Sequence, residues 1–182
     1  KKNFTFKLIA IGRIHSEKNI IVLLNALIDF YKRNFWLPDI LWVGRIDDHK
    51  YFKLCCSIIQ KNSFLNKSWK WYGERKNLIK LISKTDALIH PALYDGLSNV
   101  VCESIILGHP VLAGDVCDNK YLVGRNKRGL LFKSIDPKNI SKTIENFYNS
   151  DYKQILKMKE NSIQYSSKSL NLNKAIKKYD HI

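Results

Sequence analysis

The sequence predicts an α/β fold, with about six parallel strands in a doubly wound sheet and helices on both faces. Short apolar runs alternate with segments of ten or more residues that have helical periodicity, which is typical of βαβ units. Polar loops, several of them containing glycine, follow the apolar runs. The chain has 182 residues and 45% hydrophobic content, which is enough for one well-buried domain and short for two.

The first half of the chain supplies three expected strands and three expected helices. The strands are 4–11 (FTFKLIAI), 39–43 (DILWV) and 69–72 (WKWY), the last one closed by Gly73. The helices are 20–33, 50–62 and 78–84, because apolar residues recur in each at helical spacing. Their expected core-facing side chains are Leu23, Leu24, Leu27 and Ile28, then Phe52, Cys55, Cys56 and Ile59, then Leu78, Ile79 and Ile82. Trp71 and Tyr72 have two interpretations, stacking on a base or packing in the core.

The second half supplies three more expected strands, at 87–89, 111–113 and 130–132. A helix capped by Ser98 or Asn99 is expected to run to Leu107, and Gly108-His109-Pro110 ends it. A loop with a short helical turn is expected at 115–124. Asp136 and Pro137 are expected to begin a helix that runs to Tyr148, because proline is favoured at the first helical position. Two further helices are expected, at 151–165 and 172–179.

The stretch from His90 to Asp115 has the layout of an anion-binding site. A buried strand is followed by a polar loop with Asp95 and Gly96, and then by the start of a helix. The first N–H groups of a helix have no intrahelical partner, and the helix dipole adds roughly half a positive charge there. A second carboxylate, Glu103, lies about one helical turn into this helix.

The same stretch resembles the signature of family 4 glycosyltransferases. The matching residues are Asp95-Gly96-Leu97-Ser98-Asn99, Glu103-Ser104 and Gly108-His109-Pro110-Val111. The resemblance implies a retaining, nucleotide-sugar-dependent enzyme of the GT-B fold, each half of which is Rossmann-like. The family pattern has two glutamates, and Asp95 replaces the first one with a side chain that is one methylene shorter.

The loop after the first strand carries a second resemblance to this family. Gly12-Arg13, an apolar residue, three further residues and Lys18-Asn19 are similar to its diphosphate-binding element. The resemblance implies that Arg13 and Lys18 bind the donor diphosphate, whose negative charge grows as it leaves. The alternative for this Arg–Lys pair is an ordinary solvated loop.

The resemblance also implies a set of site residues and roles. Asp95, Arg13 and Lys18 are the expected catalytic residues, with Asp95 orienting the donor sugar rather than acting as a nucleophile. Glu103 is expected to accept hydrogen bonds from the ribose hydroxyls, and Arg75 to lie near the base. His90 has two interpretations, a contact to diphosphate or sugar and a structural histidine. The expected donor-binding residues are Gly12, Arg13, Lys18, Arg75, His90, Gly96, Leu97, Ser98, Asn99, Val100 and Glu103.

The resemblance extends from Phe6 to the terminal helices and matches the C-terminal half of a GT-B enzyme. Residues 1–182 are therefore expected to be a single donor-binding domain, and the N-terminal acceptor domain is expected to lie outside this chain. The chain starts without methionine, which is consistent with a fragment. Because the acceptor half is not part of it, we expect this chain to bind a sugar nucleotide but to be inactive alone. The expected substrates are a UDP- or GDP-sugar and a glycan or lipid-linked acceptor, as in bacterial surface polysaccharide assembly. Neither a cofactor nor a metal is expected.

The net charge of +15 favours acidic partners such as nucleotides, nucleic acid or anionic lipid. Because no nucleic-acid-binding motif is present, nucleic acid is not an expected partner. We expect a cytoplasmic location, with peripheral association at the inner face of the membrane left open. Cys55, Cys56, Cys102 and Cys117 match no metal pattern and are expected to be reduced, buried thiols. Two alternatives remain, a non-catalytic basic module that binds nucleotides or nucleic acid and a GT-B-type nucleotide-sugar epimerase.

Overall fold

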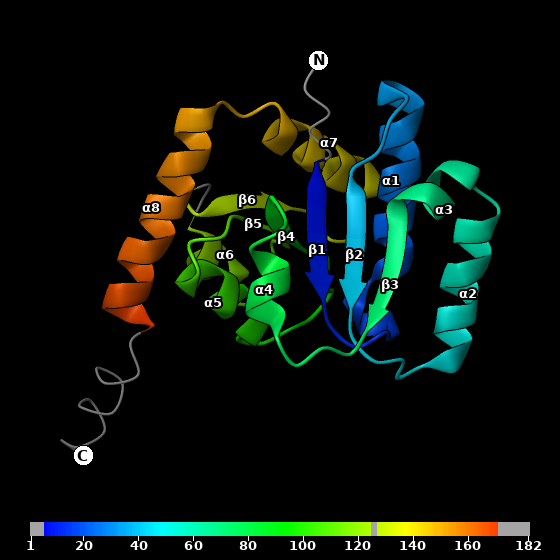
Figure 1. Cartoon of the computed structure of the whole chain (residues 1–182), viewed down its shortest axis with the longest axis horizontal. Helices are drawn as coiled ribbons and strands as arrows, with labels where there is room; N and C mark the ends of the chain where they lie inside the picture. Colours follow the sequence, from blue (N-terminus) through cyan, green and yellow to red (C-terminus); the bar gives the residue numbers. More distant parts are fainter. Residues whose placement is uncertain (1–5, 125–126, 171–182) are drawn as a thin grey trace.

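A computed structural model describes residues 6–124 and 127–170. Its centre is a six-stranded parallel sheet, which confirms the predicted doubly wound fold (Figure 1). The strands are β1 (Lys7–Ile11), β2 (Asp39–Val43), β3 (Trp69–Gly73), β4 (Ala87–His90), β5 (Val111–Gly114) and β6 (Gly129–Phe132). The helix expected at 172–179 lies outside the described residues.

The strand order β3-β2-β1-β4-β5-β6 places the change of winding direction between β1 and β4. From β1 the chain winds outward to β2 and β3, and after β3 it crosses back to β4 and winds outward the other way. Leu8 and Ile9 of β1 pair with Ala87 and Leu88 of β4, so the two strands end side by side. In open parallel sheets, ligands bind at the carboxyl ends of the strands at such a switch point.

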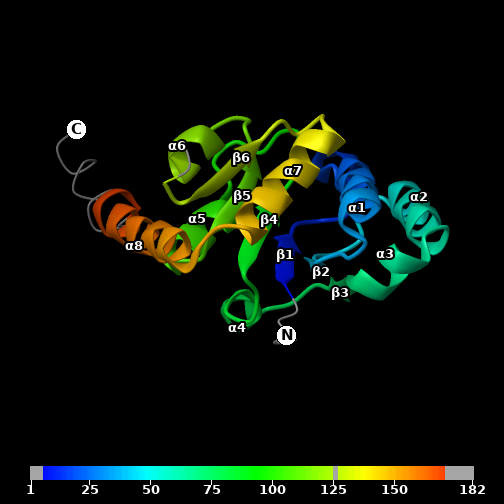
Figure 2. The ribbon, with the colours of Figure 1, turned by 90° about the horizontal axis from the view of Figure 1, so that it is seen from above.

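One face of the sheet is covered by four helices (Figure 2). They are α1 (Ile20–Asn34), α2 (His49–Gln60), α3 (Ser63–Ser68) and α7 (Pro137–Tyr148). Leu8 and Ala10 of β1 join this core, together with the predicted Leu23, Leu24 and Leu27. Trp71 packs edge-to-face on Trp69 and Phe52, with ring centroids 5.1 and 5.2 Å apart. Trp71 therefore belongs to the core.

The opposite face is covered by α4 (Leu78–Ile82), α5 (Asn99–Ile106) and α6 (Asn119–Val123). Ile9 and Ile11 of β1 face this side, which is the period-two alternation of a strand that is buried on both faces. The last helix, α8 (Tyr152–Ser169), lies beyond the β6 edge and contributes to both cores through Met158 and Tyr165. None of the helices in the described ranges is long and apolar enough to cross a lipid bilayer.

Local signals set most of the helix boundaries. Asp136 caps α7 through its carboxylate with Pro137 at the first position, as predicted. Asp151 and Gln154 form a capping box at the start of α8. The short helices α3 and η1 (Ser16–Lys18) were not expected.

The expectation that Ile79 faces the core is wrong, since Ile79 is 63% exposed. Leu78 and Ile82 already face the sheet one turn apart, so the next residue along α4 points about 100° away from them. Among the cysteines only Cys55 is buried, and burial raises the pKa of its thiol to about 12. Cys56, Cys102 and Cys117 are half-buried, and all four are free thiols.

Candidate functional site

The candidate site lies where β1 and β4 end together. Gly12 follows β1 directly, and His90 is the last residue of β4. Two loops begin here, the β1–α1 loop with Lys18 and the β4–α5 loop with Asp95. The backbone N–H of Leu93 donates to the carbonyl of Glu17 (2.9 Å), so the two loops are in direct contact.

Lys18, Asp95 and His90 form a compact charged cluster at this point. Lys18 Nζ donates to Asp95 Oδ2 at 2.8 Å, and His90 Nε2 lies 3.0 Å from the same oxygen. The side chain of His90 is only 3% exposed, and those of Lys18 and Asp95 are 16% and 26% exposed. The hydrogen bond from His90, and after it the one from Lys18, holds the pKa of the Asp95 carboxyl well below its usual range. Asp95 is therefore a fixed anion at neutral pH.

The N-terminus of α5 adjoins this cluster. Ser98 is the N-cap residue, as predicted, but its hydroxyl makes no capping hydrogen bond to the helix. Ser98 Oγ lies instead 3.4 Å from His90 Nε2. The first-turn N–H groups, including those of Asn99 and Val100, therefore keep their hydrogen-bonding capacity. Together with the helix dipole they form an anion-binding end, and Gly96 just before them has open space around it.

Asn19 links the loops of the site, a role that sequence reasoning missed. Its side chain is buried, and its Nδ2 donates to the carbonyl of Pro91 (3.0 Å) and to that of Ser134 (2.7 Å). The backbone of Asn19 is left-handed, with φ 57°. Asparagine tolerates this conformation better than most residues. The residue next to Lys18 thus holds the β1–α1, β4–α5 and β6–α7 connections together.

Arg13 lies in the same loop but contacts other partners. Its guanidinium donates to Glu17 (2.7 Å) and to Asp47 (3.0 Å), and its side chain is 44% exposed. The hydrogen bond to Glu17 raises the pKa of Arg13 above its ordinary value. The structure shows no direct contact from Arg13 to Asp95.

Gly44 lets the ends of β1 and β2 approach closely. A Cβ on Gly44 would lie 2.0 Å from the carbonyl oxygen of Gly12, and φ of Gly44 is 157°. The close packing of the two strands therefore explains why glycine stands at position 44. Trp42 Nε1 donates to the same Gly12 carbonyl, which fixes the start of the loop. A Cβ on Gly12 would meet the aliphatic stem of Lys18 at 3.4 Å.

Glu103 faces a separate hollow of about 600 Å³ between α4 and α5. Lys76 and Asn77 line its polar side, and Ile79 and Ile106 belong to its apolar side. This position explains why Ile79 is exposed rather than packed in the core. Arg75 precedes these residues in the β3–α4 loop, with its guanidinium 5.9 Å from the ring centroid of Tyr72.

The structure brings together Lys18, His90, Asp95 and Ser98, which are far apart in the sequence. Arg13 flanks this cluster through its own loop, and Glu103 lies farther along α5. Leu97 is 61% exposed beside the cluster. In the described part of the chain, no group of three His, Cys, Asp or Glu side chains is placed to hold a metal ion.

Comparisons with a family model and with solved structures relate the chain to known proteins. The family model for group 1 glycosyl transferases matches residues 1–168. A search of curated proteins found no match. The structure is similar to a glycosyltransferase from Rickettsia africae ESF-5, with a TM-score of 0.86, 18% identity and coverage of 98% of this chain and 47% of that one.

Two further solved structures have the same fold at low identity. Anabaena Alr3699/HepE in complex with UDP gives a TM-score of 0.85 and 17% identity, over 98% of this chain and 50% of that one. An S. aureus TarM mutant, in complex with Fondaparinux, alpha-GlcNAc-glycerol and UDP, gives 0.83 and 16%, over 100% and 36%. The chain thus spans half or less of the length of these proteins. Because the family model covers most of the sequence, the chain belongs to the group 1 glycosyl transferases.

Proposed function

We propose that this chain is the C-terminal, donor-binding domain of a retaining glycosyltransferase of family 4. The observation that carries the proposal is the 2.8 Å contact between Lys18 and Asp95 at the switch point of the sheet, beside the N-terminus of α5. It joins the two motifs of the family resemblance, 77 residues apart, in one site. A nucleoside diphosphate sugar fits this site because it carries both a dianion and hydroxyl groups. Anabaena Alr3699/HepE, which shares the fold, was solved with UDP-glucose as well as with UDP.

In this proposal the diphosphate lies between the β1–α1 loop and the first turn of α5. Lys18 and Arg13 provide the cations, and the N–H groups from Leu97 to Val100 provide fixed dipoles. These groups stabilise the charge that develops on the leaving phosphate. Asp95, positioned by His90 and Lys18, accepts hydrogen bonds from the hydroxyls of the donor sugar.

Glu103 binds the ribose hydroxyls in this proposal, and the hollow between α4 and α5 takes the base. The apolar wall of this hollow suits the faces of a base, while Lys76 and Asn77 supply polar contacts. Arg75, which precedes Lys76 in the β3–α4 loop, contacts the base in this proposal. The leaving phosphate itself serves as the base for the incoming hydroxyl. Because Arg13 and Lys18 supply two cations beside the diphosphate, the proposed reaction uses no divalent metal.

The acceptor is a glycan or a lipid-linked glycan in this proposal, and an N-terminal domain of the same enzyme binds it. We place the enzyme in bacterial surface polysaccharide synthesis, in the cytoplasm or at the inner face of the membrane. Because one domain binds the donor and the other binds the acceptor, transfer of the sugar requires both domains. This chain alone is therefore expected to bind the donor without transferring the sugar.

Calorimetry with UDP, GDP and a DNA oligomer tests the proposal on this chain. We expect selective binding of one nucleoside diphosphate, weakened about tenfold or more by Lys18→Ala, because a charge-assisted hydrogen bond is lost. Glu103→Ala should weaken nucleoside diphosphate binding without changing the affinity for inorganic pyrophosphate. Lys53→Ala and Glu160→Ala are matched controls on exposed helix faces and should leave the affinity unchanged. Equal binding of DNA and both nucleotides would instead support a non-specific basic module.

Arg13 is tested in a protein that also contains the acceptor-binding domain. Arg13→Ala should lower turnover by about a hundredfold or more, as the loss of an oxyanion donor does. Turnover close to that of the unsubstituted enzyme would remove Arg13 from the catalytic set. Product analysis with a single sugar nucleotide separates transfer from epimerisation.

A further inference from the structure

A second polar surface runs along α8 and the start of β6, on the amino-terminal edge of the sheet. Three hollows open there, of about 540, 410 and 230 Å³, and all three are lined by Lys127. The first and the third also share Asn161, so they are adjacent along α8. We refer to this surface as the α8 groove. It is distinct from the donor site because Lys127 precedes β6, whereas the donor site follows the ends of β1 and β4.

The α8 groove is cationic. The described residues that line its three hollows include no aspartate or glutamate. Lys157, which also pairs with Glu160 at 3.6 Å, and Lys168 lie eleven positions apart on α8, or roughly 16 Å along the helix axis. The charges therefore suit an extended anion rather than a single small ion. Arg128 is only 7% exposed and donates to the carbonyls of Tyr121 and Leu122, so it supports the wall rather than facing the groove. The exposed cationic residues are Lys120, Lys127, Lys157 and Lys168.

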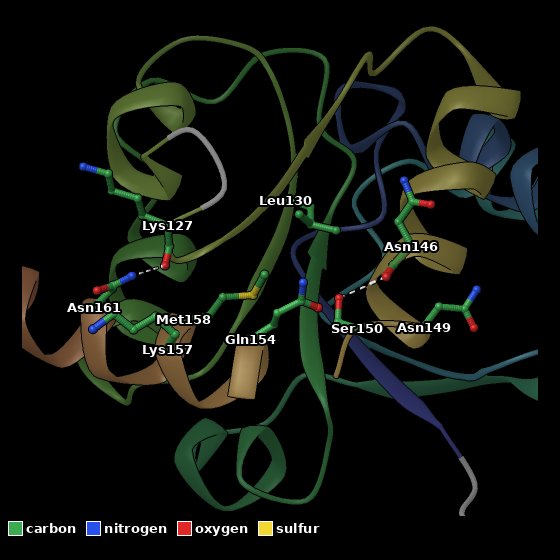
Figure 3. A pocket seen from close by; sticks show the side chains of 9 residues that line it. All are labelled: Lys127, Leu130, Asn146, Asn149, Ser150, Gln154, Lys157, Met158 and Asn161. Carbon is green, nitrogen blue, oxygen red and sulfur yellow. Dashed lines mark hydrogen bonds between the residues drawn. The ribbon is translucent and has the colours of Figure 1, made fainter. Parts of the chain in front are cut away.

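The groove also has amide groups over an apolar floor (Figure 3). Leu130 and Met158 form the floor, and the amide-bearing Asn146 of α7 and Gln154 and Asn161 of α8 line the hollow around it. Asn149, just after α7, points away from the floor. Asn161 donates its Nδ2 to the carbonyl of Lys127 (2.8 Å), which leaves its Oδ1 as an acceptor. The amide-bearing residues are Asn146, Asn149, Gln154, Asn161 and Gln164. Amides pair with sugar hydroxyls as both donors and acceptors, and an apolar floor suits the C–H face of a sugar ring.

Two other classes of polyanion fit the groove less well. Single-stranded nucleic acid needs free aromatic faces on which bases stack. Here the guanidinium of Arg128 covers the ring of Tyr165 at 3.8 Å, and the Lys120 ammonium lies 5.0 Å from the ring centroid of Tyr121. An anionic membrane is flat and cannot reach the recessed floor, where Met158 is only 7% exposed.

We infer that the α8 groove binds an acidic glycan chain, with lysines on its anionic groups and amides on its hydroxyls. The site would hold a polymer on the domain while the donor site at the opposite edge of the sheet remains accessible. The inference does not depend on the donor being a UDP- or GDP-sugar. It rests on the charge, the amides and the continuity of the three hollows.

The probe is dextran sulfate, with neutral dextran of the same length as the reference, titrated into this chain. We expect dextran sulfate to bind and neutral dextran not to bind. The combined variant Lys127→Gln, Lys157→Gln and Lys168→Gln should weaken binding by about tenfold, the effect of losing three exposed ion pairs. A control with the same change in charge is Lys50→Gln, Lys53→Gln and Lys61→Gln near α2, at the far end of the molecule (Figure 1). An equal loss in the control would show that only net charge matters and would overturn the inference.

The amides are tested with a polyanion that has no hydroxyl groups. The variant Asn146→Ala with Asn149→Ala should weaken binding of dextran sulfate and leave binding of inorganic polyphosphate unchanged. An equal change for both probes would overturn the assignment to a saccharide, as would tighter binding of a DNA oligomer or of phosphatidylglycerol vesicles. Thermal unfolding serves as the control for folding, and it should change little because all these variants replace exposed side chains.

Discussion

Removing the side chain of Asn19 should loosen the donor site and destabilise the whole domain. Two hydrogen bonds are lost, at 2.7 and 3.0 Å, and both acceptor carbonyls belong to connections that flank the site. At about 0.5 to 1.5 kcal/mol each, the two bonds are worth about 2 kcal/mol. Asn19→Gly removes the amide but keeps the left-handed backbone accessible. In Asn19→Ala the left-handed backbone costs about 1 kcal/mol more, so the free energy of unfolding should fall by about 3 kcal/mol in total.

Thermal unfolding and urea titration measure these differences on the same chain. For a domain of this size, 1 kcal/mol corresponds to about 2 to 4 °C, so Tm should fall by about 6 °C in the glycine variant and by about 9 °C in the alanine variant. The glycine variant should also bind UDP more weakly at a temperature where it is fully folded, because the loop that carries Lys18 is no longer fixed to the β4–α5 and β6–α7 connections. A free energy of unfolding within about 0.5 kcal/mol of that of the parent chain would refute the proposed role of Asn19 in linking the loops, since this is the ordinary effect of a surface substitution.

Three further predictions concern the site and its support. Asp95→Asn should lower stability yet bind UDP about as tightly as the parent chain or more tightly, because Lys18 loses a competing carboxylate; markedly weaker binding in calorimetry would contradict this reasoning. Burial lowers the pKa of His109 from 6.5 to about 4. As pH drops through this range, the unfolded chain binds a proton that the folded chain does not, so the free energy of unfolding falls by about 3 kcal/mol. In His109→Gln, urea titrations should show a flatter stability profile across this range, and an unchanged profile would assign the effect to other groups. Gly44→Ala should destabilise the domain by more than about 2 kcal/mol because its Cβ meets a backbone oxygen at 2.0 Å, and a fully stable variant in thermal unfolding would show that the strands can separate freely.

Local sequence patterns were sufficient to predict the sheet and most helices. The apolar run at 39–43 and the cap at Asp136 are each encoded within a few neighbouring residues, and both matched the structure. The order of the strands is not local, because it depends on which strand the crossover after β3 reaches. The α/β pattern predicts that the loops of Arg13, His90 and Asp95 meet at the carboxyl edge of the sheet, and the family resemblance supplied their roles.

The contacts that the sequence did not reveal are those between connections distant in the chain. Asn19 bonds a carbonyl 72 positions away and another 115 positions away, and a backbone carbonyl carries no signature of its partner. The contact between Arg13 and Asp47, 34 positions apart, likewise has no local signal in the sequence. The left-handed backbone at Asn19 is the one feature that has a local signal, since asparagine is enriched in that conformation.

If the site binds a nucleoside diphosphate sugar as proposed, its charges determine which groups attract this donor. The ion pairs there join three cations, Arg13, Lys18 and Arg45, with three carboxylates, Glu17, Asp47 and Asp95. These side chains are neutral as a set, so the net charge of +15 does not originate here. The N–H groups at the start of α5 are fixed positive dipoles, and none of these three carboxylates pairs with them. In the proposed function a diphosphate therefore meets this helix end first. Lys18, which has three N–H donors, then contacts a phosphate while it still positions Asp95. Cations held in place in this way suit transition-state stabilisation by fixed groups.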